Sequence, residues 1–156
     1  MQIKELKNLM EASNFNFKKK FGQNFIIDEN IIKSIITKSD IDENTLVIEI
    51  GVGAGALTIG LSQVAKNVLC YEIDETLKQV LDVTLKNEKN VDIMYKDFLQ
   101  ADIKNDIKKY EYKKIYVIAN LPYYITTPII MRIIESKIDV DKIVVMVQKE
   151  VGDRFK

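Results

Sequence analysis

The sequence predicts an α/β fold in which a parallel sheet is covered by helices on both faces. From residue 45 onward, short β-branched runs alternate with amphipathic stretches. The runs 46–48 and 143–147 are apolar without alternation, as expected of strands covered on both faces. We therefore expect a doubly wound sheet in spatial order 3-2-1-4-5, with a ligand crevice at the carboxyl ends where strands 1 and 4 diverge.

Local patterns place the individual elements in chain order. Apolar residues at helical spacing predict helices over 1–12 and 28–38, the second behind Asp28 as N-cap. Between them, the polar, aromatic and basic stretch 13–24 predicts an ordered loop. The expected strands are 45–50, 67–72, 91–95, 115–119 and 142–148. The expected core helices lie near 56–65, 74–87 (capped by Asp74) and 127–137, with a short helix or loop in 100–114.

Composition limits the chemistry that is available. The chain has 156 residues and no histidine, which excludes a Ser-His or Cys-His nucleophile pair and a histidine-rich zinc site. The lone Cys70 excludes an internal disulfide, indicates a reducing compartment and, lying in a predicted buried strand, is expected in the core. No apolar run approaches the roughly 18 residues of a membrane span, so we expect one cytoplasmic domain without a membrane partner.

Charge is balanced overall, with 23 basic and 23 acidic side chains, but it is unevenly distributed along the chain. Residues 1–27 hold five lysines and two acids, residues 28–102 hold seven lysines and 14 acids, and residues 103–156 hold 11 basic and seven acidic side chains. The acidic middle suits a cationic ligand and the basic flanks suit a polyanion, although solvated surface charge explains both equally well.

Three glycines follow the first predicted strand, at positions 51, 53 and 55, and lead into a helix. Glycines at this place let the backbone turn sharply and let a ligand approach it closely. The spacing G-x-G-x-G differs from the G-x-G-x-x-G of dinucleotide-binding proteins and lacks the Gly-Lys of a P-loop. The glycines indicate a close approach of a ligand, with a purely structural turn as the alternative, and their spacing disfavours a nicotinamide oxidoreductase.

Acidic side chains follow the next two predicted strands. Glu72 lies 21 residues beyond Gly51, where a carboxylate can accept hydrogen bonds from both ribose hydroxyls of a nucleoside. Asp97 follows the third strand and can accept from an adenine amino group at the same rim, with helix capping as the alternative.

The segment Asn120-Leu-Pro-Tyr123 follows the fourth predicted strand, in the expected crevice. Asn120 supplies a side-chain carbonyl, Pro122 restricts the turn so that the carbonyl of Leu121 can point inward, and Tyr123 offers an aromatic face. This set fits an exocyclic amine: two acceptors on its hydrogens favour the tetrahedral, nucleophilic nitrogen, while the ring stacks on the base. A turn with a packed tyrosine is the alternative.

Together, the 49–58 and 120–123 motifs resemble those of Rossmann-like class I S-adenosylmethionine-dependent methyltransferases that modify the amino nitrogen of adenine. The segments 20–25 (Lys-Phe-Gly-Gln-Asn-Phe) and 126–128 (Thr-Thr-Pro) narrow the resemblance to the ribosomal RNA adenine dimethyltransferases. Gly22 and Pro128 favour the small-subunit branch over the large-subunit, macrolide-resistance branch.

This resemblance implies S-adenosylmethionine as methyl donor, no metal, and small-subunit rRNA in an immature ribosomal subunit as partner. It implies that Asn24, Ile26, Gly51, Gly53, Glu72, Asp97 and Asn120 bind the cofactor and that Asn120, Leu121, Pro122 and Tyr123 face the target adenine. Val52 and Tyr124 replace the proline and asparagine that are common in the family.

Family members also extend further, with two more strands and a helical RNA-binding domain. We therefore expect 1–156 to be an N-terminal catalytic domain (1–44 helices and loop, 45–156 αβ core), truncated and with an exposed sheet edge at 142–148 that favours self-association. The alternatives are the large-subunit rRNA enzyme and a cofactor-binding module without turnover.

Overall fold

A parallel sheet forms the centre of the protein in the computed structural model, which describes residues 28–146. Its five strands lie in the order β3-β2-β1-β4-β5, and every neighbouring pair is parallel, which confirms the order expected from the sequence. The strands are β1 (Thr45–Ile50), β2 (Asn67–Tyr71), β3 (Val91–Met94), β4 (Lys114–Asn120) and β5 (Lys142–Met146).

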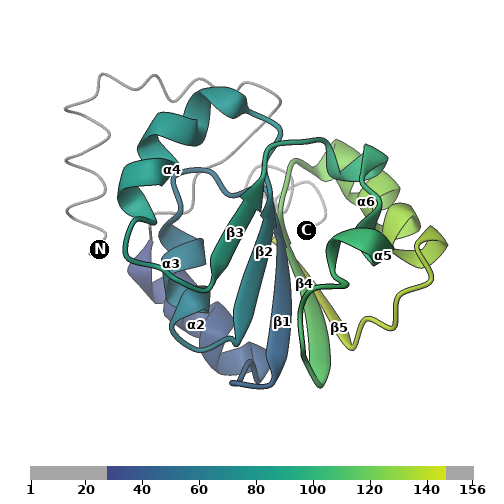
Figure 1. The fold of residues 1–156 in the computed structure, drawn as a ribbon, viewed down its shortest axis with the longest axis horizontal. Helices are drawn as coiled ribbons and strands as arrows, with labels where there is room; N and C mark the ends of the chain where they lie inside the picture. The colour runs from purple at the N-terminus through teal and green to yellow at the C-terminus, as the bar shows by residue number, and fades with distance from the viewer. Residues whose placement is uncertain (1–27, 147–156) are drawn as a thin grey trace, which may run out of the picture.

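Helices cover both faces of this sheet (Figure 1). One face is covered by α2 (Glu29–Ser39), α3 (Ala56–Ser62) and α4 (Lys78–Thr84), and the other by α5 (Ile103–Asp106) and α6 (Tyr123–Glu135). The short 3₁₀ helices η2 (Glu75–Leu77) and η3 (Phe98–Gln100) follow β2 and β3. The expected helix 1–12 and loop 13–24 lie outside the described residues.

The capping predictions are confirmed. The carboxylate of Asp28 accepts from the backbone N–H groups of Asn30 and Ile31 at the start of α2. Asp74 likewise accepts from the N–H of Thr76 at 3.0 Å and begins η2. The single helix expected over 74–87 is instead two elements, the 3₁₀ helix η2 and the α-helix α4. The second of these ends at its C-cap residue, Leu85.

Helix α6 begins earlier than expected. The sequence pattern predicted a helix near 127–137. In the structure Pro122 is the N-cap, α6 starts at Tyr123, and Pro128 lies inside the helix. The helix therefore starts directly after β4, which brings its first turn to the carboxyl end of the sheet.

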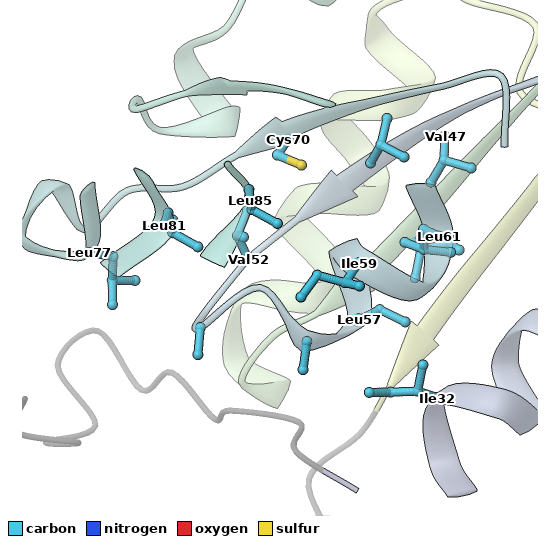
Figure 2. Close-up of a cluster of buried hydrophobic side chains, with 14 of the residues drawn as sticks. Ile32, Val47, Val52, Leu57, Ile59, Leu61, Cys70, Leu77, Leu81 and Leu85 are labelled. Atoms are coloured by element: carbon cyan, nitrogen blue, oxygen red, sulfur yellow. The ribbon is translucent and has the colours of Figure 1, made fainter. Parts of the chain in front are cut away.

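The core has two halves because β1 is buried on both faces along its whole length. Val47 faces the half that lies under α2, α3 and α4, where Cys70 is fully buried as expected (Figure 2). Leu46 and Ile48 face the half under α5 and α6. This double burial explains why the strand shows no alternation of polar and apolar residues.

Gly60 allows α2 to lie against α3. A Cβ at this position would come within 2.8 Å of Ile36 Cδ1 and 2.9 Å of Ile32 Cγ2. The two helices thus approach at a point where any larger side chain would separate them.

At the opposite end of the sheet from β3, strand β5 pairs with β4 and has no second neighbour among residues 28–146. Ile143 on this strand is 39% exposed. The open, apolar edge expected from the sequence is therefore present in the described part of the chain. Within that part, none of the helices is long and apolar enough to cross a membrane.

Candidate functional site

A cavity of about 120 Å³ opens at the carboxyl ends of β1, β2, β3 and β4, where the sequence predicts the ligand crevice. Its polar and charged lining includes Glu72, Asp97 and Lys96. Its apolar lining comes from the ends of β1 and β2, from η3, from the turn after β4 and from α6. The full lining is Ile50, Gly51, Tyr71, Glu72, Ile73, Lys96, Asp97, Phe98, Leu121, Pro122, Tyr124, Ile125 and Ile129.

The structure thus brings Gly51, Glu72, Asp97, Leu121 and Pro122 together, as predicted. Asn120 ends β4 directly before the lining residue Leu121. The backbone of Tyr123 begins α6, but its side chain lies outside the description, as do the whole of Asn24 and Ile26.

All three glycines of the turn after β1 have positive φ angles, of 82° at Gly51, 59° at Gly53 and 92° at Gly55. This confirms that the turn requires glycine. At Gly51 the close neighbour is the protein itself: a Cβ would lie 2.8 Å from the backbone carbonyl oxygen of Asn120. The glycine therefore lets β1 and β4 end side by side beneath the cavity.

Glu72 anchors this turn. Its side chain is only 1% exposed, and Oε1 accepts from the N–H groups of Val52 at 3.0 Å and Gly53 at 3.1 Å, while Oε2 accepts from the N–H of Asp74 at 2.9 Å. The sequence predicted a ligand contact here but missed this second role, because the bonds join residues 19 and 20 positions apart.

Asp97 caps a helix and also lines the cavity. Its Oδ1 accepts from the N–H of Leu99 at 2.9 Å and caps η3, which confirms the capping alternative. The same residue lines the cavity.

Glu49 is a buried acid for which the sequence did not indicate a role. Its Oε1 accepts from the Thr58 hydroxyl at 2.6 Å, and Oε2 has no hydrogen-bond partner among the described residues. Burial raises the pKa of this carboxyl to about 8, with the Thr58 bond opposing the rise and the nearby Glu72 charge adding to it. The available signal was an acid between Ile48 and Ile50 in an otherwise apolar strand.

The turn after β4 is rigid. Pro122 has φ −59° and ψ 148°, is buried, and accepts from the N–H of Ile125 at 3.2 Å through its carbonyl. Tyr124, which is 67% exposed, also lines the cavity. A cavity lined by two acids and by apolar side chains suits a nucleoside. Within residues 28–146 there is no acid or cysteine cluster that could hold a metal ion.

A doubly wound parallel sheet with a glycine turn after β1, an acid after β2 and an Asn-Leu-Pro turn after β4 defines a Rossmann-like methyltransferase fold. The chain belongs to the ribosomal RNA adenine dimethylase family, whose model matches residues 14–155.

Relatives and solved structures agree with this assignment. The chain is 49% identical over 151 residues to the ribosomal RNA small subunit methyltransferase A of Streptococcus thermophilus, covering 96% of this chain and 52% of the relative. The protein of the same name from Staphylococcus haemolyticus is 51% identical, with 96% and 51% covered. The chain thus spans about half the length of the curated relatives it matches.

Two solved structures share the fold at 27% identity. The 23S rRNA methyltransferase ErmE has a TM-score of 0.66, covering 83% of this chain and 50% of that one. A dimethyladenosine transferase from Plasmodium falciparum has a TM-score of 0.65, covering 81% and 44%. The two TM-scores are nearly equal, so the fold similarity does not favour one of these two proteins over the other.

Proposed function

We propose that the protein transfers methyl groups from S-adenosylmethionine to the amino nitrogen of adenine in small-subunit ribosomal RNA. The observation that supports this most is the convergence of Glu72, Asp97, Leu121 and Pro122 on one cavity. The small-subunit branch is favoured because relatives near 50% identity bear that name.

The residues around the cavity fit the adenosine part of this cofactor. Glu72 would accept from the ribose hydroxyls, and Asp97 would accept from the adenine amino group. Buried apolar side chains such as Phe98 and Ile129 would form the surface against which the adenine base packs. Asn24, Ile26, Gly51, Gly53 and Asn120 complete the proposed cofactor set.

Bound S-adenosylmethionine supplies an electrophilic methyl group, so the protein's task is to prepare the attacking amine. The side-chain carbonyl of Asn120 and the backbone carbonyl of Leu121 would accept its two hydrogens, which keeps the lone pair on nitrogen available. Tyr123 would stack on the target base, and Pro122 keeps the turn in one conformation. Orientation and electrostatics then supply the catalysis without a histidine base.

Residues 1–156 would act as the S-adenosylmethionine-binding catalytic domain, and the ribosomal substrate places the protein in the cytoplasm. The basic flanks would meet the phosphates of rRNA, while the acidic middle holds the cationic sulfonium ligand. The open β5 edge would favour self-association of this chain.

Two measurements test the function. Calorimetry should show binding of S-adenosylmethionine and no binding of NAD, since the glycine spacing is not that of a dinucleotide site. Labelled methyl groups should then be transferred to small ribosomal subunits that lack the modification, in preference to large ones. Preferential transfer to large-subunit rRNA would support the other branch of the family, and binding without any transfer would support a cofactor-binding module.

A further inference from the structure

Three side chains form a hydrogen-bonded cluster beside the cavity, with Asp106 of α5 at its centre. Asp106 Oδ2 accepts from the Tyr71 hydroxyl at 2.7 Å and lies 3.0 Å from Lys96 Nζ. The Lys96 ammonium also lies 5.9 Å from the centre of the Tyr71 ring. Lys96 and Tyr71 both line the cavity.

Two residues of this cluster are direct sequence neighbours of the two acids that line the cavity. Tyr71 directly precedes Glu72, and Lys96 directly precedes Asp97. Each acid that faces the cavity therefore follows a residue that Asp106 holds. The two acids come from the ends of different strands, β2 and β3, and Asp106 reaches both strand ends from a third element.

Burial makes these contacts stronger than a surface ion pair. The side chain of Asp106 is 8% exposed and that of Lys96 is 37% exposed. By contrast, Lys109 and Asp92 form a 3.4 Å pair whose side chains are both much more accessible to solvent. Exposed pairs contribute little, whereas a shielded carboxylate with two partners has a defined position.

The hydroxyl of Tyr71 is a constant donor in this cluster. Burial and the adjacent Asp106 carboxylate raise the pKa of Tyr71 well above its usual range, so the proton stays on the phenol. Its ring packs edge-on against Phe98, with centroids 5.1 Å apart, which joins the cluster to η3 directly after Asp97.

We propose that Asp106 and Lys96 are positioning residues for adenosine recognition, which hold the ends of β2 and β3 so that the carboxylates of Glu72 and Asp97 keep their separation. This inference rests on the proposed binding of an adenosine group in the cavity. It predicts that loss of the cluster reduces selectivity for the adenine amino group, beyond any effect on stability.

The test uses the 156-residue chain and two ligands that differ at one position, S-adenosylhomocysteine and its 6-oxo analogue S-inosylhomocysteine. Calorimetry on the unaltered chain should show a preference of about tenfold for the amino compound, the size of one charge-assisted hydrogen bond. Asp106→Asn and Lys96→Met should each reduce this preference to about twofold or less. Lys96→Arg should retain the preference, because arginine keeps a positive charge beside Asp106. Lys109→Met, which breaks the exposed pair, should leave the preference unchanged.

Thermal unfolding of each variant separates selectivity from stability, because a merely structural role lowers the melting temperature without changing the ratio of the two affinities. Should Asp106→Asn not fold, the Lys96→Met and Lys96→Arg comparison decides the question alone. An unchanged preference in Lys96→Met overturns the inference. So does an equal loss of affinity for both ligands in Lys96→Met, which would indicate direct contact of Lys96 with the ligand. If the unaltered chain binds neither compound, the proposed function fails first and this inference with it.

Discussion

Gly51 lies directly against the backbone of Asn120, so closely that a Cβ on the glycine would be 2.8 Å from the asparagine carbonyl oxygen. The two residues are far apart in the sequence, but β1 and β4 pair in register up to Ile50 and Ala119, just before them. The residue proposed to hold the reacting amine thus lies against the glycine turn that follows β1.

Gly51→Ala should therefore damage both stability and binding. The positive φ of 82° and the clash with Asn120 together predict a loss of about 2–4 kcal/mol in the free energy of unfolding. Binding of S-adenosylmethionine by the folded fraction should also weaken. Denaturant unfolding and calorimetry measure the two effects. Gly60→Ala is the control, since its clash with Ile32 and Ile36 lies at the α2–α3 contact and should lower stability alone.

Glu72→Ala should reduce the affinity for S-adenosylmethionine by about 1.5–3 kcal/mol, the range for hydrogen bonds to a charged group. It should also destabilise the free protein, because the buried N–H groups of Val52 and Gly53 lose their acceptor. Glu72→Gln keeps an acceptor and should cost less. Calorimetry and thermal unfolding check both effects, with Glu75→Gln on the exposed side of η2 as control. Unchanged affinity in the alanine variant would remove Glu72 from the ligand site.

Glu49 should make stability depend on pH. Its pKa is about 8 in the folded protein and near 4.5 in the unfolded chain, so the folded state binds more protons between these values. Stability should therefore fall as pH rises from about 4.5 to 8, by at most about 1.4 kcal/mol per pH unit. Urea unfolding at a series of pH values measures this slope. Glu49→Gln should flatten it, and an equal slope in the variant would contradict the assignment.

Asn120→Ala should reduce methyl transfer on the order of a hundredfold, by analogy with loss of one positioned polar group at a reacting centre. Tyr123→Ala should lose about 1–3 kcal/mol of base stacking, whereas Tyr123→Phe should keep most of it. Labelled methyl transfer to small ribosomal subunits, with a chain of the relatives' full length, measures both. The stacking role would be wrong if the phenylalanine and alanine variants had equal activity.

The open edge of β5 should make the 156-residue chain associate with itself at high concentration. Ile143 is exposed on this strand, so Ile143→Lys should return the chain to a monomer by adding charge to the edge. Light scattering reports the mass of both forms. Tyr112→Lys, at an exposed position before β4, is a matched control and should not change the mass. A monomeric unaltered chain at high concentration would refute the expectation.

Local pattern was sufficient to predict the glycine turn and the caps formed by Asp28 and Asp74, because each depends on residues within a few positions of one another. The strand order followed from the alternation of strands and helices along the chain, which is typical of a doubly wound sheet. The position of the cavity also followed from the sequence, since parallel strands present their carboxyl ends at one edge. The start of α6 did not follow, because Pro128 is compatible with both the first turn and the interior of a helix that neighbouring packing supports.

The hydrogen-bond partners and the protonation of the buried acids were decided only by the tertiary structure. The sequence indicated Glu72 as a ligand residue, but its bonds to Val52 and Gly53 depend on β1 and β2 lying side by side. The protonated state of Glu49 depends on the helices that exclude water from its strand. The link from Asp106 to Tyr71 spans 35 residues. Sequence spacing specifies local geometry, whereas burial and hydrogen bonds between distant segments arise only when the sheet brings those segments together.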